Sequence, residues 1–391
     1  MKWPAKRITE SSTKSFGMYD KAQSLMEQGV DLIHLEVGMP SFDTPGHIKE
    51  ATKKALDEGQ VHYSDFRGTQ KFREALVEKV GEINNIIAES DEILVCSGLT
   101  HAAFAIGMAA IDEGDEVIVF EPYYPQHINK IMLPGGKVVP VPLDRKNGFR
   151  IDAETIEKSI TSNTRMIALV NPANPTGRVF SYEELDSLAK VAIKHDLLVM
   201  SDEVYEQITY DGHRHISIAS LPGMKERTFT MFSFTKGYAM DGWRMGYIVA
   251  DKKFMPALLK ITTNDIAHLN TFIQAGGYAA ITGSQDCVRE MVADDELRRD
   301  VVVKRMNAMP HVSCNIPEAT IYAFPDISAT GLPSQQIADE ILEEAHVVVE
   351  AGAFYGAAGE GHLRICFGAE PVERLEEAMN RLENYFQNKA K

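Results

Sequence analysis

The residues MIALVNPANPTGRVFSYEELDSLAKVAIKHDLLVM, positions 166–200, decide the fold. They begin with one short apolar run, Met166–Val170, and end with another, Leu197–Met200. Between these runs, Tyr182–His195 carries apolar residues at three- and four-residue spacings, and Ser181 stands where a helix N-cap is expected. A strand, a helix and a second strand in this order are typical of one unit of a parallel sheet.

The same alternation extends over the middle of the chain. An Ala-rich helix is expected at Thr100–Ile111, with Gly114 as its stop. Short apolar runs of this kind are typical of strands buried on both faces. We therefore predict an α/β fold whose large domain has three layers, α/β/α, around a mainly parallel sheet. The further strands are expected at Ile93–Cys96, Glu116–Phe120, Lys137–Val141, Thr228–Phe232 and Gly246–Val249.

The two ends of the chain have a different pattern. A chain of 391 residues exceeds what one compact core usually holds, so two domains are expected. Residues 48–290 are predicted to form the large domain. Residues 1–47, a polar arm with one short helix, and residues 291–391 are predicted to form a smaller α+β domain. Its elements are expected to be a helix at Val288–Met309, strands near Thr320–Phe324 and Leu363–Phe367, and a helix at Pro371–Gln387.

Composition excludes several classes of function. The net charge of −16 argues against nucleic acid or an anionic membrane as the main partner. No signal peptide and no apolar run long enough to span a bilayer is present, which favours a cytoplasmic protein. The four cysteines form no Cys-x-x-Cys pair and are expected to be buried in a reduced compartment. His213 and His215 lack further ligands nearby, so a polar turn is expected there and no metal site.

Unusual residues follow directly after four of the expected strands, where ligands gather in open α/β sheets. Ser97–His101 is a glycine turn that feeds a helix N-terminus, which suits an anion. Asn171–Gly177 is a rigid Pro-rich loop that presents two Asn amides. Ser201–Tyr205 carries carboxylates at the end of a buried strand. Judged alone, each is explained equally well or better by an ordinary turn or helix cap.

The fourth segment, Ser233–Tyr247, contains Lys236 and Arg244 between two strands. A desolvated lysine has a lowered pKa and can act as an amine nucleophile, and an arginine can grip a phosphate. A lysine considered alone is far more often a solvated surface charge. Together with Asp202 and Asn174, however, the set supplies what a pyridoxal 5′-phosphate (PLP) site requires.

These segments resemble the fold type I, class I/II aminotransferases, in the branch of prokaryotic aspartate and aromatic aminotransferases. The resemblance runs from Gly38–Pro45 to Leu363–Phe367 and is most specific at Asn171–Gly177 and Ser233–Tyr247. It implies a PLP-dependent aminotransferase, a transferase of nitrogenous groups, that moves an amino group between an L-amino acid and a 2-oxo acid. It also implies a homodimer with shared active sites.

The resemblance further implies roles around the cofactor ring. Lys236 would form the Schiff base and move the substrate α-proton. Asp202 would pair with the ring nitrogen, Asn174 and Tyr205 would donate to the ring 3′ oxygen, and Tyr124 would stack on the ring. Lys236, Asp202 and Tyr205 are the expected catalytic residues.

The same resemblance assigns the phosphate and the substrate. The phosphate would be held by residues of one subunit and by Tyr63 of its neighbour. Arg364, with the Gly38 backbone N–H and Asn174, would hold the substrate α-carboxylate. Without the resemblance, Arg364 is better explained as an outward-facing arginine of an edge strand. The phosphate-binding residues of the same subunit are expected to be Gly98, Leu99, Thr100, Ser233 and Arg244.

Two departures bear on the substrate. Branch members specific for dicarboxylic substrates often have a lysine where Thr100 stands, and Met39 replaces a more polar residue at the entrance. Arg67, close to Tyr63, could offer a different anion contact. Apolar or aromatic amino acids are therefore slightly favoured over aspartate.

Three other functions are compatible with parts of the sequence. A β-eliminating carbon–sulfur lyase on the same fold would use the same lysine. A non-catalytic PLP-sensing regulator would need a DNA-binding module for which this acidic chain has no spare residues. A nucleotide-binding α/β protein is disfavoured because the glycine turn is neither a G-x-G-x-x-G nor a Walker pattern.

Overall fold

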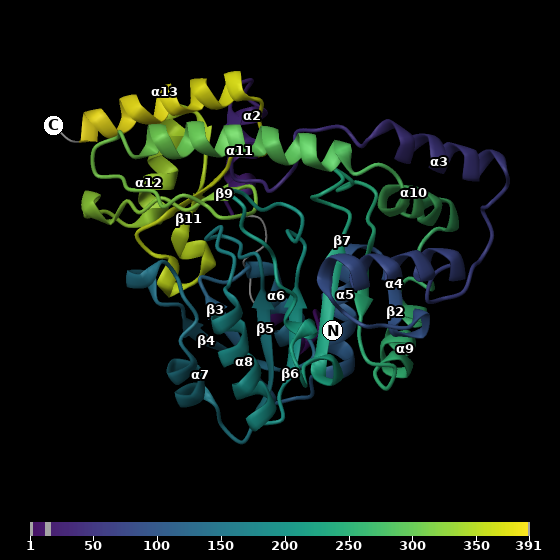
Figure 1. Ribbon diagram of the computed structural model, residues 1–391. Coiled ribbons are helices and arrows are strands. Elements are labelled where there is room, and N and C mark those ends of the chain that lie inside the picture. The colour runs from purple at the N-terminus through teal and green to yellow at the C-terminus, as the bar shows by residue number, and fades with distance from the viewer. Residues whose placement is uncertain (1–2, 12–16, 390–391) are drawn as a thin grey trace.

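The fold is built on a seven-stranded sheet, and the computed structural model describes residues 3–11 and 17–389 (Figure 1). All seven runs expected to be strands belong to this sheet. One strand, β8, is antiparallel to both of its neighbours, and the other pairs are parallel, as expected for a mainly parallel sheet. In spatial order the strands are β2 (Ile93–Cys96), β8 (Gly246–Val249), β7 (Thr228–Ser233), β6 (Leu198–Asp202), β5 (Thr164–Val170), β3 (Glu116–Glu121) and β4 (Lys137–Pro142).

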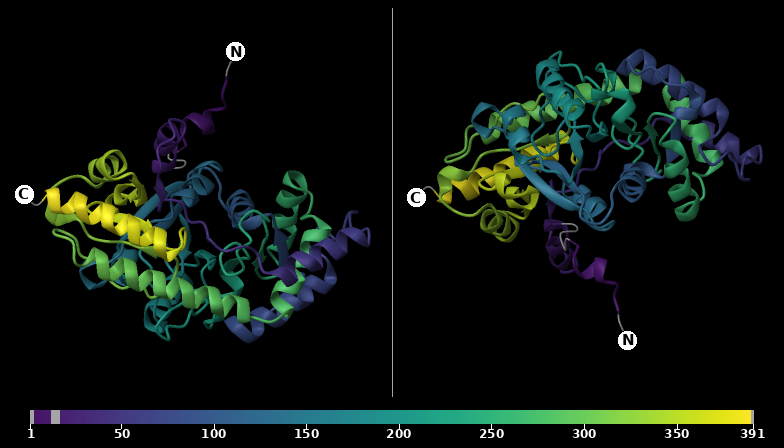
Figure 2. Two further views of the ribbon diagram at one scale, coloured as in Figure 1. Left: turned by 90° about the horizontal axis from the view of Figure 1, so that it is seen from above. Right: turned by 90° about the horizontal axis from the view of Figure 1, so that it is seen from below.

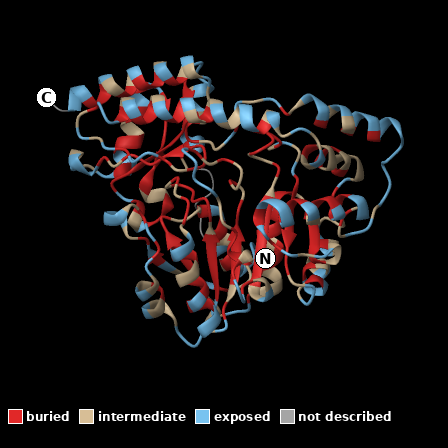
Figure 3. Cartoon of the chain, viewed as in Figure 1, coloured by how far each residue is buried: buried red, intermediate tan, exposed pale blue. Residues whose placement is uncertain are grey.

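Helices cover both faces of the sheet, because successive side chains of a strand point to opposite faces. Met166 and Ala168 pack into one buried cluster, and Ile167 and Leu169 pack into another. The first cluster includes residues of α5 (Gly98–Ala110), α6 (Pro125–Met132) and α9 (Met255–Asp265). The opposite face is covered by α7 (Ala153–Ser159), α8 (Tyr182–Lys194), α3 (Gly46–Asp57), α4 (Gln70–Asn84) and α10 (Thr271–Thr282). The result is the predicted three-layer arrangement, with buried strands between half-exposed helices (Figure 3).

The cap of α8 lies where the sequence predicts it. The Ser181 hydroxyl accepts a hydrogen bond from the Glu184 N–H at 3.3 Å. The Glu184 carboxylate in turn accepts one from the Ser181 N–H at 3.0 Å. This reciprocal pair satisfies two backbone donors that a helix start leaves free.

A second core draws on both ends of the chain. Met18, Leu35, Val347 and Phe386 belong to one buried cluster. The N-terminal part contains two helices where one was expected, α1 (Lys6–Thr9) and α2 (Met18–Met26), and Figure 2 shows α1 projecting away from the body. The remaining elements are β1 (Ile33–His34), β9 (Tyr322–Ala323), α12 (Ser334–Glu340), β10 (Val347–Val348), β11 (Glu350–Ala351), β12 (Leu363–Cys366) and α13 (Val372–Lys389).

One long helix, α11 (Asp286–Met306), joins the two cores. Val288 packs near its start with residues of the sheet, and Val302 packs near its end in the second core. Along this second half α11 lies beside α13 (Figure 1). The predicted boundary at residue 290 therefore falls inside a helix. Among the described residues, no helix is long and apolar enough to cross a membrane.

Candidate active site

The strand ends that carry the candidate residues meet at one edge of the sheet. Val170, the last residue of β5, is in register with Asp202, the last residue of β6. Asp202 is in turn in register with Met231 of β7, two residues before Ser233. Gly246, at the start of the antiparallel β8, pairs with Ser233 and with Cys96. The four segments singled out in the sequence are thus neighbours.

A half-buried lysine and a buried arginine converge on one short backbone segment. The Lys236 amine donates a hydrogen bond to the Gly38 carbonyl, and the Arg364 guanidinium donates one to the Glu36 carbonyl. The pKa of the Lys236 amine is lowered to about 8, mainly by burial, with smaller contributions from the charges of Arg364 and Arg244. At neutral pH a much larger share of this amine is uncharged than for an exposed lysine.

Arg364 does not lie on an exposed edge. β12 is the central strand of a three-stranded sheet, between β11 and β9, and Arg364 is only 7% exposed. Its guanidinium lies 4.5 Å from the ring centre of Tyr322 and 5.2 Å from that of Tyr355. The alternative of an outward-facing edge arginine is therefore wrong.

Tyr205 reaches the same region through a residue that the sequence did not single out. Its buried hydroxyl donates a hydrogen bond to the Tyr322 hydroxyl at 2.7 Å. The Tyr322 hydroxyl fills the place that a side chain at position 38 would occupy, so Gly38 must lack one. Tyr322 thus connects Tyr205, Gly38 and Arg364. No motif surrounds Tyr322 in the sequence, and only the pairing of β9 with β12 brings it here.

Asp202 is held by two donors at the end of β6. Its Oδ1 accepts a hydrogen bond from the Val204 N–H at 3.2 Å, and its Oδ2 lies 2.9 Å from His127 Nε2. His127 is buried, and its ring packs edge-on against Tyr124 at 5.2 Å. His127 does not belong to any of the motifs singled out in the sequence. The available signal was its position three residues after Tyr124, on the same face of a helix.

The remaining candidates form a cradle that suits an anion. Gly98, Leu99 and Thr100 open α5, where backbone N–H groups have no helical partner. A Cβ at Gly98 would lie 2.6 Å from an Arg244 nitrogen, so that guanidinium spans the start of the helix. Ser233 pairs with Gly246, two residues after Arg244, and its hydroxyl donates to the Thr235 hydroxyl at 2.8 Å. Thr235 is a further polar neighbour that the sequence analysis did not name.

Several buried polar atoms at this edge have no hydrogen-bond partner among the described residues. They include Asn174 Oδ1 and Arg364 Nε. Unsatisfied buried groups are rare in proteins and point to a missing partner. A carboxylate can accept a hydrogen bond from Arg364 Nε, and a hydroxyl can donate one to Asn174 Oδ1. The residues present therefore fit PLP and an amino acid.

Three candidates lie apart from this constellation. Tyr63 is 87% exposed, and its ring packs edge-on against His268 at 5.3 Å. Arg67 forms an ion pair with Asp65 at 3.1 Å, so its charge is already partly neutralised. Met39 is 47% exposed, which leaves an apolar surface beside Gly38.

His215 has a structural role that the sequence did not reveal. The turn lies at Asp211–Gly212, as expected, but the His215 side chain is buried and its Nε2 lies 2.8 Å from Glu203 Oε2. Glu203 also accepts hydrogen bonds from the Ser201 and Ser217 hydroxyls at 2.8 and 2.9 Å. This network fixes the strand end next to Asp202. No group of residues suited to a metal ion is found within the described ranges.

Replacing His215 with alanine is expected to lower the free energy of unfolding by about 1–3 kcal/mol, because the buried Glu203 loses a partner. His213→Ala, at an exposed position of the same loop, is the matched control and should change it by less than about 0.5 kcal/mol. Urea unfolding of both variants measures the difference. Equal stabilities would show that the contact contributes nothing.

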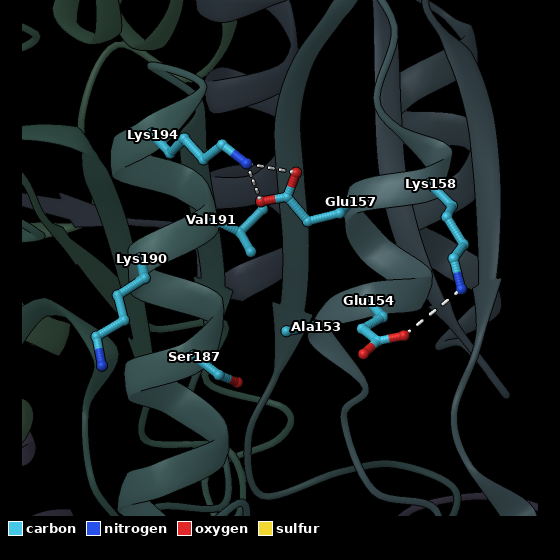
Figure 4. Close-up of a pocket in the computed structure, with 8 residues that line it drawn as sticks. All are labelled: Ala153, Glu154, Glu157, Lys158, Ser187, Lys190, Val191 and Lys194. Atoms are coloured by element: carbon cyan, nitrogen blue, oxygen red, sulfur yellow. Dashed lines mark hydrogen bonds and ion pairs between the residues drawn. The ribbon is translucent and has the colours of Figure 1, made fainter.

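A separate groove lies away from this site, lined by residues of α7 and α8. It measures about 520 Å³ between α7 and α8 (Figure 4). Its charged side chains pair with one another or with neighbours, as Lys194 does with Glu157 at 3.0 Å and Lys190 with Asp186 at 2.5 Å. A smaller cavity of about 20 Å³ includes Tyr124, His127 and Asn174 in its lining and adjoins the site.

Comparison with known proteins places the chain in a family. Residues 30–382 match the family model for aminotransferases of class I and II. The chain belongs to this family, whose members use PLP, and it is an aminotransferase.

The four free cysteines form no disulfide, and three of them are buried.

Relatives named for two different substrates, aspartate and aromatic amino acids, are about equally similar to this chain. An aspartate aminotransferase from Pyrococcus abyssi is 41% identical over 92% of each chain. The aromatic-amino-acid aminotransferase 2 of Thermococcus litoralis is 39% identical over 93% of this chain and 94% of its own. The crystal structure of an aromatic aminotransferase from Pyrococcus horikoshii OT3 superposes with a TM-score of 0.89 at 38% identity, covering 94% of this chain and 99% of that one.

Proposed function

We propose that this enzyme catalyses reversible transamination between an L-amino acid, with apolar or aromatic donors preferred over aspartate, and a 2-oxo acid. PLP would be held covalently by Lys236. The observation that carries the proposal is the convergence of the Lys236 amine and the Arg364 guanidinium on the carbonyls of Gly38 and Glu36. An amine of lowered pKa beside a buried arginine suits a reaction at the carbon that bears a carboxylate.

Each residue of the site would contribute a separate step. When bound, PLP supplies an electron sink for the carbanion formed as the α-proton leaves. Arg364 would bind the substrate carboxylate and thereby orient the Cα–H bond. The Lys236 amine would take the proton from the substrate Cα and, in the reverse direction of the reaction, return a proton to Cα.

Four further residues would act on the cofactor ring, and others would hold its phosphate. Asp202 would hold a proton on the ring nitrogen, and its own position is fixed by His127 and the Val204 N–H. Tyr205 and Asn174 would donate to the ring oxygen. Tyr124, at the start of α6 and beside His127, would cover the ring. The Gly98–Thr100 turn, Ser233 and Arg244 would hold the phosphate.

A homodimer would complete the site. Tyr63 is exposed in the single chain, as are Val61 and Phe66 of the same loop. Exposed aromatic and apolar side chains in one loop are typical of an interface. Tyr63 would then reach the phosphate bound by the partner subunit. We also propose a cytoplasmic location, from the sequence features given above.

The preference for apolar or aromatic donors rests on three residues expected near the entrance of the active site. Thr100 offers no cation, Arg67 is paired with Asp65, and Met39 is half-exposed beside Gly38. A distal carboxylate would thus meet little compensating charge from these residues. The absence of a cation should disfavour aspartate relative to phenylalanine or tyrosine.

Half-reactions test both the reaction and the preference. The PLP-loaded enzyme is mixed with single amino acids, and its conversion to the pyridoxamine form is followed by absorption. Phenylalanine and tyrosine are expected to react with a kcat/KM at least about tenfold above that of aspartate. Faster reaction of aspartate would refute the preference. Release of ammonia and a 2-oxo acid without an acceptor would instead identify the carbon–sulfur lyase alternative.

A further inference from the structure

The Tyr355 hydroxyl is a buried polar group that the roles above do not use. Tyr355 ends a short 3-10 helix, Gly352–Tyr355, and is 1% exposed. Its hydroxyl has no hydrogen-bond partner among the described residues. Leaving a buried hydroxyl unpaired costs about 1–3 kcal/mol. Such a group in a binding region indicates a partner that arrives with the ligand.

The backbone around Tyr355 is tied to the strand end that carries Tyr124. The Tyr355 carbonyl accepts a hydrogen bond from the Tyr123 N–H at 2.9 Å. The Glu121 carboxylate, at the end of β3, accepts hydrogen bonds from the Ala357 and Ala358 N–H groups at 2.8 and 3.3 Å. These contacts fix the backbone at and just after Tyr355, and its ring packs edge-on against those of Phe354 at 5.5 Å and Phe324 at 6.2 Å. The hydroxyl is therefore held in place before any ligand binds.

The surroundings of the hydroxyl identify its partner. The Arg364 guanidinium lies 5.2 Å from the ring centre of Tyr355. Burial raises the pKa of Tyr355 well above its usual value, and the charged or polar groups that act on it include Arg364 and Tyr322. Within the described part of the chain, Arg364 Nε has no hydrogen-bond partner, like the hydroxyl. Two unsatisfied donors on neighbouring side chains suit a group with several acceptor lone pairs and no donor of its own, which is a carboxylate.

We propose that the Tyr355 hydroxyl donates a hydrogen bond to the substrate carboxylate held by Arg364, and so helps to set the affinity for amino and 2-oxo acids. The proposal rests on the proposed function, because it takes Arg364 as the carboxylate clamp. Tyr355 is then a substrate-binding residue. It would act on every substrate alike, since all of them carry the carboxylate.

Tyr355→Phe removes only the oxygen and tests the proposal. The PLP-loaded protein is titrated with 3-phenylpropanoate, a carboxylate without an amino group that binds but cannot react. The dissociation constant is expected to rise about tenfold in the variant, as for loss of one hydrogen bond to a charged group. The unfolding temperature of the ligand-free variant should stay at or above that of the wild type, because an unpaired buried hydroxyl has been removed.

Tyr247→Phe is the matched control. Tyr247 has another buried hydroxyl for which the described residues offer no partner, but its ring packs on Phe232 in the core. This change should leave the dissociation constant for 3-phenylpropanoate within about twofold of the wild-type value. Equal affinities in wild type and Tyr355→Phe would overturn this inference alone. Failure of the wild type to bind 3-phenylpropanoate would overturn the clamp at Arg364, and this inference with it.

Discussion

Lys236→Ala is expected to reduce the rate of amino-group transfer by at least about a thousandfold and to abolish covalent attachment of PLP. The variant loses the amine that binds the cofactor and moves the α-proton, and general acid–base catalysis alone contributes about 10²–10⁴-fold. Non-covalent PLP can still bind through the phosphate cradle. After reduction with borohydride, mass spectrometry should find the adduct on the Lys236 peptide in the wild type and no adduct in the variant.

Lys236→Arg separates the charge from the chemistry. Arginine keeps a cation near the Gly38 carbonyl but cannot act as an amine nucleophile. It should therefore be as inactive as the alanine variant while remaining folded. Substantial turnover by either variant would exclude Lys236 as the reacting amine.

The pH dependence of PLP attachment provides a second check on the same amine. Only the neutral amine reacts, and burial lowers the pKa of Lys236 to about 8. The rate of attachment to the cofactor-free protein should thus rise with pH and level off just above pH 8. An ordinary lysine would give a rate that still rises towards a pKa of about 10.4. A steady tenfold rise per pH unit up to pH 10 would contradict the burial argument.

The main features of the sheet and its functional edge could be predicted from the sequence because they depend on local patterns. Each apolar run could be read as a strand, and in parallel strands the carboxyl ends share an edge. Asp202 and Ser233 could therefore be placed together before the structure was known. Register supports this placement, since Asp202 of β6 pairs with Met231 of β7.

The partners of these residues could not be predicted in the same way. His127 reaches Asp202 across 75 positions of the chain, and Tyr322 reaches Tyr205 across 117. Neither contact gives a recognisable residue spacing in the sequence, because each depends on how two distant elements pack together. The contact of Arg364 with the Glu36 carbonyl is harder still, since a backbone acceptor has no residue type to recognise.

At the helix ends and in the N-terminal part, the differences between prediction and structure are smaller. Helix α5 begins at Gly98, two residues before the predicted start. Gly98 has a φ of +73°, which glycine adopts readily, and its missing side chain leaves room for Arg244. The strand β1 consists of Ile33 and His34 alone and pairs with Val347 and Val348. Two residues are too few to give a recognisable alternation. It forms because a distant partner strand is available.

Asp202→Ala is expected to leave PLP bound but to reduce the rate of α-proton removal by at least about a hundredfold. A fixed negative charge beside the ring nitrogen stabilises the charge that develops as the proton leaves, and loss of one such electrostatic contact costs about 10²–10³-fold. The half-reaction with phenylalanine, followed by stopped-flow absorption, measures this step directly. With phenylalanine deuterated at Cα, the isotope effect should increase in the variant because proton removal becomes slower than the other steps.

Asp202→Asn distinguishes the charge of this residue from its place in the hydrogen-bond network. Asparagine has the same shape and can still accept a hydrogen bond from the Val204 N–H and remain next to His127. If the negative charge matters, the Asn variant should be nearly as slow as the Ala variant. If Asp202 only positions His127, the Asn variant should keep near-normal rates. That second outcome would transfer the role of Asp202 from the cofactor to the packing of α6, and the proton on the ring nitrogen would then need another source.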